Sequence, residues 1–116
     1  MIFGIGTDLI RIERFEKAIE QHGDRFAERI LMPEELAGYW DRKLKARYLA
    51  MRFAGKEAVS KSLGTGFAHG IWVRDIGIVH NDWGKPDVVF SERGVKVCRE
   101  LGVGKCHVSL TDDGGV

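Results

Sequence analysis

Hydrophobic positions along the chain follow two periods. Up to residue 66 they recur every three or four residues, as on the buried face of a helix, whereas beyond it they alternate or form short runs, as in strands. The run Met1–Thr7 is an early exception, because it is apolar, contains two glycines and predicts a buried strand against which another segment packs closely. The helical spacing predicts four helices: one with Ile12, Phe15 and Ile19 on one face, one from Asp24 through Leu31, one beginning at Pro33, and one from about Leu44 to Leu63.

Beyond residue 66 the pattern predicts a hairpin, a helix and a last strand. Residues 81–86 contain Asn, Asp, Gly and Pro and are typical of a hairpin turn. Ser91 and Gly102 are suited to begin and end a helix. The fold class expected is therefore α+β, with an antiparallel sheet packed on the long helix. The strands are expected at residues 71–73, 76–79, 88–90 and 105–110.

Composition indicates an ordinary globular protein. A chain of 116 residues with 44% apolar and 30% charged residues predicts one domain, residues 1–116. No apolar run approaches the ~20 residues needed to cross a bilayer, and no signal peptide is apparent, so we expect a cytoplasmic protein without a membrane partner. Cys98 and Cys106 lack metal-ligand spacing and are expected to be small buried hydrophobes. The net charge of +1 argues against a nucleic-acid partner.

Positive charge is concentrated on the predicted long helix. Between residues 42 and 61 there are seven cations and a single acid, Glu57. Such a run is commonly a solvated helix face, but here it suggests an anionic partner, with phosphate groups preferred. The cations are Arg42, Lys43, Lys45, Arg47, Arg52, Lys56 and Lys61.

Three acids of the sequence are candidates for chemistry. Glu57 lies one turn from Lys61 in the middle of an alanine stripe, so the pair is either a solvated ion pair or a site completed by a ligand or ion. Asp8 lies at the predicted junction of the first strand and first helix, where it is either an N-cap or a metal ligand. Glu35 follows Pro33, where the helix dipole favours an acid.

Three separated segments resemble one protein family. Together they are similar to the holo-acyl-carrier-protein synthase family, which are small 4′-phosphopantetheinyl transferases, and the resemblance covers essentially the whole chain. The segments are residues 4–9 with Arg14, residues 52–61 with the Gly-Thr-Gly at 64–66, and the His-Val-Ser-Leu-Thr at 107–111.

The resemblance implies a Mg²⁺-dependent enzyme that transfers phosphopantetheine from coenzyme A to a serine hydroxyl of apo-acyl carrier protein. It assigns Asp8 and Glu57 to the metal and Lys61 to the phosphates, and it implies a homotrimer with clefts between subunits. It also implies that Arg14 and the first helix face the acidic carrier protein or the ligand, although a salt-bridged surface would explain the same charges. Residues expected to contact coenzyme A are Arg52, Ser60, Lys61, Gly64, Thr65, Gly66, His107 and Ser109.

The resemblance leaves alternatives for the group that accepts the serine proton. Glu35 matches a general base that acts through water, but a metal-bound water would serve equally, and His107 would either transfer a proton or contact the nucleotide.

The family usually has His-Glu where this chain has Asp112 and Asp113, and it continues into a final strand that these residues lack. We therefore expect an incomplete C-terminus. A rival hypothesis is a binding module that holds coenzyme A or an acidic protein without turnover, and it would not need Asp8 and Glu57 together.

Overall fold

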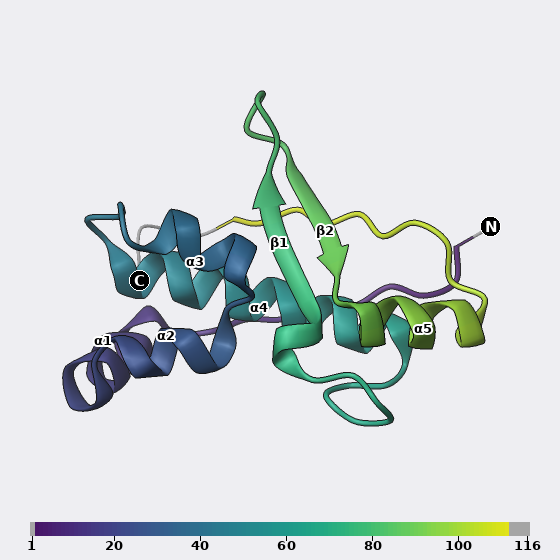
Figure 1. Ribbon diagram of the computed structural model, residues 1–116, viewed down its shortest axis with the longest axis horizontal. Helices are drawn as coiled ribbons and strands as arrows, with labels where there is room; N and C mark the ends of the chain where they lie inside the picture. The colour runs from purple at the N-terminus through teal and green to yellow at the C-terminus, as the bar shows by residue number, and fades with distance from the viewer. Residues whose placement is uncertain (1, 112–116) are drawn as a thin grey trace.

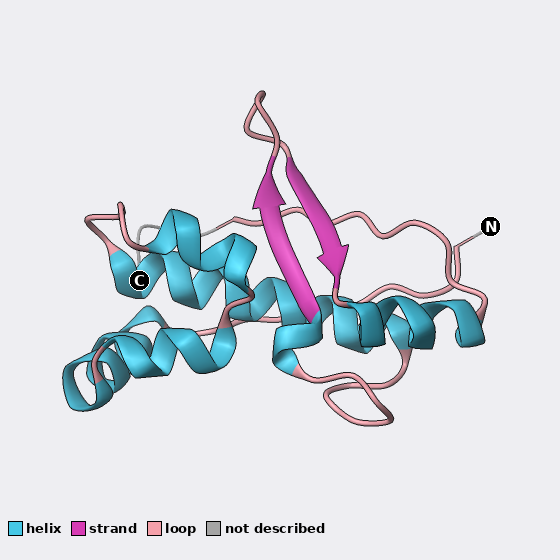
Figure 2. Ribbon diagram, in the orientation of Figure 1, coloured by secondary structure: helices cyan, strands magenta, loops and turns pink. Residues whose placement is uncertain are grey.

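The computed structural model describes residues 2–111, which form five α-helices, a short 3₁₀ helix and one two-stranded sheet (Figures 1 and 2). This α+β architecture agrees with the predicted class. In chain order the elements are α1 (Ile12–His22), α2 (Asp24–Ile30), α3 (Pro33–Tyr39), α4 (Lys45–Leu63), the 3₁₀ helix Val73–Asp75, β1 (Ile76–His80), β2 (Pro86–Phe90) and α5 (Glu92–Leu101).

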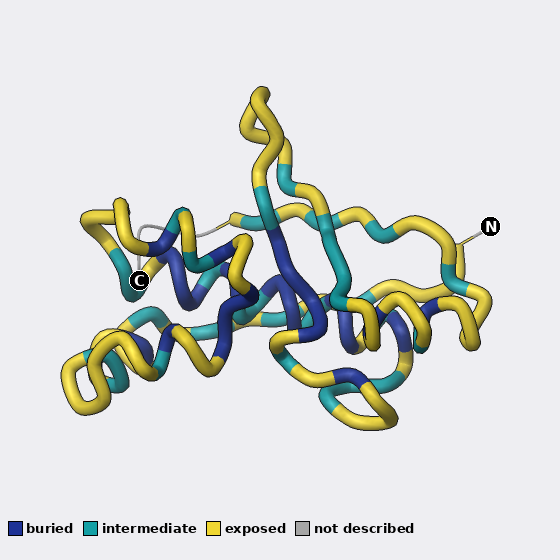
Figure 3. Tube along the Cα trace, viewed as in Figure 1, coloured by how far each residue is buried: buried dark blue, intermediate teal, exposed yellow. Residues whose placement is uncertain are grey.

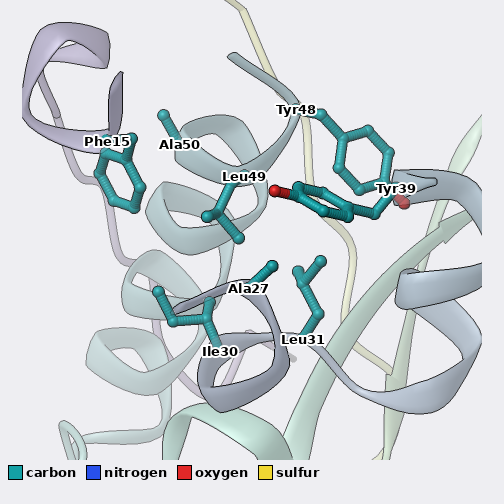
Figure 4. Packing of buried hydrophobic residues seen from close by; sticks show 8 residues of the cluster. All are labelled: Phe15, Ala27, Ile30, Leu31, Tyr39, Tyr48, Leu49 and Ala50. Atoms are coloured by element: carbon teal, nitrogen blue, oxygen red, sulfur yellow. The ribbon is translucent and has the colours of Figure 1, made fainter. Parts of the chain in front are cut away.

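The long helix α4 is the centre of the molecule. The tube in Figure 3 is buried along much of α4 and at the base of β1, and it is exposed at the periphery. Two apolar clusters share this helix. Its first half packs against α1, α2 and α3 in the cluster of Figure 4, and its second half packs against β1 and α5. Because α4 is covered on several sides, its sequence lacks a single apolar stripe.

The hairpin projects from the helical layer (Figure 1). β1 and β2 pair antiparallel from Ile76 opposite Phe90 to His80 opposite Pro86. Its base is buried through Ile76 and Ile78, whereas its tip is exposed. The Asn81 side chain closes the turn by accepting hydrogen bonds from the Trp83 and Lys85 amides, each at 2.9 Å. The predicted hairpin is thus confirmed.

The helix ends follow the sequence signals. Gly64 and Gly102 adopt left-handed conformations just after α4 and α5, with φ of 81° and 78°. Ser91 caps α5 by accepting a hydrogen bond from the Gly94 amide at 3.0 Å. The strand predicted at residues 71–73 is wrong, because Val73 already belongs to the 3₁₀ helix.

The predicted first strand is also wrong in its secondary structure, although its close packing is confirmed. Residues 2–11 are extended but form no sheet ladder. Gly4 and Gly6 instead lie directly against the backbone of α4, where a Cβ atom would collide with the carbonyl oxygens of Ser62 and Ala58. The two glycines therefore let this segment dock on the helix.

The predicted last strand has the expected alternation without the ladder. Cys106, Val108 and Leu110 are half-buried, while His107 and Ser109 are exposed on the other side. No described segment bonds to this backbone as a neighbouring strand, so the segment remains extended coil. Asp112 and Asp113 lie outside the described residues, so the structure does not address their role. None of the described helices is long and apolar enough to span a membrane.

Candidate functional site

Asp8 and Glu57 lie next to one another although they are far apart in the sequence. The docked N-terminal segment carries Asp8 to α4, where its Oδ1 accepts a hydrogen bond of 2.7 Å from Lys61 Nζ. The same ammonium lies 3.3 Å from the Thr7 carbonyl oxygen. Asp8 does not cap the first helix, because α1 begins at Ile12 with Arg11 in the cap position. The capping alternative is therefore wrong.

The pKa shifts of Glu57 and Lys61 are those expected when two neighbouring acids share nearby cations. Burial raises the pKa of Glu57, and the negative charge of Asp8 and a hydrogen bond between the two side chains raise it further. Lys61 and Arg14 oppose this increase through their positive charges. The pKa of Lys61 is also raised, mainly by its hydrogen bond to Asp8. Two adjacent carboxylates beside exposed space would gain from a further cation.

Neighbouring acids of this kind suit a hard divalent cation. Mg²⁺ is commonly bound by one or two carboxylates and completes its coordination with water and substrate phosphates. Among residues 2–111 no cluster of three or more His, Cys, Asp or Glu side chains could hold a metal alone. Asp8 and Glu57 therefore fit a magnesium ion shared with a phosphorylated substrate.

A cleft of about 780 Å³, lined by Asp8 but not by Glu57, follows α4. It lies between the N-terminal segment and residues 102–111, which both run along the helix. Asp8, His107 and Ser109 line it, and the exposed side chains of the last two are available to a ligand. We call it the carboxylate cleft.

A second pocket of about 900 Å³ opens at the first half of α4, and we call it the basic pocket. No carboxylate occurs among the described residues that line it. Arg52 extends into its wall with only 6% of its surface exposed. The two pockets share Met51, Leu110 and Thr111, so they adjoin. The ionisable residues that line the basic pocket are Arg42, Lys43, Arg47, Tyr48, Arg52 and His80.

The structure does not bring every expected residue into these pockets. Ser60 is buried within α4, where its hydroxyl donates to the Glu57 carbonyl oxygen at 2.8 Å. Gly64 ends the helix, and the amides of Thr65 and Gly66 bond back to the Ser60 carbonyl oxygen at 3.2 and 3.1 Å. In the single described chain none of these four residues lines either pocket, and neither do Glu57 and Lys61.

Glu35 lies in the interior rather than in a cleft. Its carboxylate accepts a hydrogen bond of 2.5 Å from Lys56 and bonds of 2.9 Å from the amides of Met32 and Ile78. Neither side chain of the Glu35–Lys56 pair has exposed surface. This environment supplies a structural reason for the acid beyond the helix dipole.

Lys56 has a structural role, although its position in the sequence groups it with the other cations between residues 42 and 61. Its ammonium also donates to the carbonyl oxygens of Val73, at 3.1 Å, and Ile76. The available signal was its spacing, since Lys56 is in phase with the apolar Leu49 and Leu63 at seven-residue intervals. A charged residue on that face must be buried and paired.

Comparisons with known proteins identify the family of this chain. A family model for the 4′-phosphopantetheinyl transferase superfamily matches residues 4–112. The holo-[acyl-carrier-protein] synthase of Halorhodospira halophila is 46% identical over 113 residues, covering 97% of this chain and 90% of that protein.

Solved structures extend the likeness to three dimensions. The crystal structure of the Neisseria meningitidis holo-[acyl-carrier-protein] synthase superposes with a TM-score of 0.93 at 38% identity, covering 99% of this chain and 92% of that one. The Helicobacter pylori synthase in complex with coenzyme A superposes with a TM-score of 0.82 at 30% identity, covering 96% of this chain and 91% of that one. This chain belongs to the 4′-phosphopantetheinyl transferase superfamily.

Proposed function

We propose that this protein transfers the 4′-phosphopantetheine group of coenzyme A to a serine hydroxyl of apo-acyl carrier protein. The products are the holo-carrier protein and adenosine 3′,5′-bisphosphate, and the reaction supports fatty acid synthesis. The observation that carries the proposal is the meeting of Glu57 on α4 with Asp8, which lines the carboxylate cleft. The Halorhodospira halophila relative is by its name a holo-[acyl-carrier-protein] synthase, and the Helicobacter pylori synthase was solved in complex with coenzyme A.

Asp8 and Glu57 would hold the Mg²⁺ ion, with the pyrophosphate of coenzyme A completing its coordination. When bound, the ion supplies neutralisation of negative charge on the pyrophosphate. Lys61 is placed beside Asp8 to add a second positive charge to the same phosphates. Such fixed charge is the main contribution a protein makes to phosphoryl transfer.

The reaction forms a bond from the serine oxygen to the β-phosphorus of the pyrophosphate and breaks the bond to the adenosine bisphosphate. The serine proton leaves to solvent or to a group at the cleft. His107 is exposed there, whereas Glu35 is fully enclosed and its carboxylate is already hydrogen-bonded. We therefore leave Glu35 outside the proposed proton path and assign His107 and Ser109 to contacts with the nucleotide.

The basic pocket would hold a further phosphate group of the same substrate, chiefly through Arg52. Its cations and the absence of acid among its described lining residues support this assignment. Ser60 and residues 64–66 line no pocket of the single chain, so contacts from them to coenzyme A depend on a cleft completed by another subunit.

Assembly as a homotrimer is part of the proposal. Ile2, Ile5 and Leu9 expose 75%, 79% and 95% of their surfaces on the N-terminal segment, next to the carboxylate cleft. Apolar side chains gathered in this way are typical of an interface between subunits. The exposed Arg14 on α1 is a cationic contact for the acidic carrier protein.

The direct test incubates the protein with coenzyme A, Mg²⁺ and an apo-acyl carrier protein and measures the mass of the carrier. We expect an added phosphopantetheine. Asp8→Ala and Glu57→Ala are each expected to lower the rate by ~10²-fold or more, the scale for loss of preorganised charge stabilisation. Glu100→Ala, an exposed acid of α5 outside both pockets, is the matched control and should keep full activity. Full activity of either cleft variant at saturating Mg²⁺ would exclude a shared ion, and binding without transfer would indicate a binding module.

A further inference from the structure

Tyr48 lies between two arginines of the basic pocket. The guanidinium carbon of Arg52 is 3.8 Å from the centroid of the Tyr48 ring, and that of Arg42 is 5.0 Å from it. Guanidinium groups within about 6 Å of an aromatic centroid are attracted by its negative face. One ring therefore stabilises two cations, which reach it from α4 itself and from the turn before α4.

The Tyr48 ring is itself held firmly. Its hydroxyl donates a hydrogen bond of 2.6 Å to the carbonyl oxygen of Glu35, and only 7% of the residue is exposed. It also lies beside the Tyr39 ring (Figure 4), and the two ring centroids are 6.1 Å apart. Glu35 is fixed in turn by the buried ion pair with Lys56. The position of the ring is thus set by the protein interior rather than by the pocket.

Arg52 is paired in an unusual way for a buried arginine. Its Nη2 lies 2.9 Å from His80 Nδ1, and its Nε is buried without a hydrogen-bond partner among the described residues. A buried cation is normally paired with a carboxylate, because burial of an unpaired charge is costly. No described carboxylate bonds to this guanidinium. No bonded acid of the described residues therefore neutralises its charge.

We propose that Tyr48 is a positioning residue that fixes Arg42 and Arg52 for a phosphate group of the donor substrate. An acid in its place would orient the arginines equally well, but it would neutralise the charge that attracts the phosphate. The aromatic face orients them and leaves their charge available. Tyr48 acts through the arginines and makes no contact with reacting atoms. The inference rests on the proposed use of coenzyme A.

The test compares Tyr48→Phe, which keeps the ring, with Tyr48→Leu, which removes it. Tyr48→Leu is expected to raise the KM for coenzyme A about tenfold, while kcat and the KM for the carrier protein stay within about twofold. Tyr48→Phe is expected to stay near the parent KM. An Arg52→Gln background should abolish most of the effect of Tyr48→Leu, since the tyrosine would have lost the group it positions.

A second variant keeps the proposal testable if Tyr48→Leu does not fold. Replacing Tyr48 by 3,4,5-trifluorophenylalanine nearly preserves the shape of phenylalanine but weakens the negative face of the ring. It should raise the KM for coenzyme A about threefold over Tyr48→Phe. Equal KM values for these two variants, or equal increases in the KM for both substrates, would overturn the proposal.

Failure of the proposed function would be recognised separately. The dissociation constant for coenzyme A is measured by calorimetry on the same proteins, without carrier protein. If the parent protein transfers nothing yet the trifluoro variant binds coenzyme A more weakly than Tyr48→Phe, the enzymatic assignment fails and the role of Tyr48 stands. If the parent transfers phosphopantetheine and all variants bind equally, the role of Tyr48 fails alone.

Discussion

The buried ion pair of Glu35 and Lys56 gives the sharpest stability prediction. Lys56→Met fills the same space but leaves the Glu35 carboxylate in the interior with only the amides of Met32 and Ile78 as partners. Breaking a buried pair by removal of one partner costs about 3–5 kcal/mol. Since small domains have only about 5–15 kcal/mol of stability, the variant should lose roughly a fifth of it or more.

Urea unfolding followed by circular dichroism measures this loss as a lower midpoint at unchanged slope. Lys96→Met is the control, because that lysine is exposed on α5, and it should change stability by less than about 0.5 kcal/mol. The double variant Lys56→Met/Glu35→Gln should regain about 1–2 kcal/mol, since the unpaired charge is gone while one acceptor remains for the two amides. A loss below about 1 kcal/mol in the single variant, or no recovery in the double, would refute the reasoning.

The double variant also examines the catalytic alternative for Glu35. If this acid is only structural, the folded double variant should keep transfer activity within about tenfold of the parent. A loss of ~10²-fold or more in a protein that is still folded would favour Glu35 as the general base, at the scale such groups contribute.

Three further changes each test one contact of the structure. Gly6→Ala should push the N-terminal segment from the Ala58 carbonyl oxygen. It should lower transfer at least about tenfold with a small change in melting temperature, whereas Glu100→Ala, an exposed position of α5 outside both pockets, should be silent in both assays. Asp75, at the end of the 3₁₀ helix, accepts hydrogen bonds from the Arg93 guanidinium, the Ser91 hydroxyl and the Trp72 amide. Burial raises the pKa of Asp75, but these hydrogen bonds lower it below its ordinary value, so Asp75→Asn should cost about 2 kcal/mol at neutral pH in urea titrations. That deficit must shrink as the pH falls through the lowered pKa of Asp75, and an unchanged deficit at pH 3 would contradict the assignment. Arg14→Glu should raise the KM for carrier protein more than that for coenzyme A, and equal increases would exclude a specific contact.

Elements defined by local signals could be predicted from the sequence. α4 was expected from Leu44 to Leu63 and spans Lys45–Leu63, because apolar spacing and Gly64 mark its face and its end. The hairpin was expected because residues 81–86 form a turn between apolar runs. The meeting of Asp8 with Glu57 was expected through the resemblance, since nothing local connects the two positions.

Features that depend on partners distant in the sequence could not be predicted. Residues 105–110 alternate as a strand does, but alternation determines which side chains face inward and not whether another backbone pairs with the segment. Lys56 was grouped with the solvated cations, because its burial follows from the packing of α3 and β1 on the opposite side of α4. Nothing in the sequence indicated the role of Tyr48, since that role depends on the turn that brings Arg42 beside its ring.

The close packing of Gly4 and Gly6 on α4 also has a pharmacological consequence. One acid of the pair is carried by a rigid helix and the other by a coil held largely by backbone contact, beside a cavity of about 780 Å³. An inhibitor that wedges between coil and helix would part the two carboxylates without resembling a nucleotide. Such a compound would need no phosphate of its own and would avoid the poor cell entry of charged substrate mimics.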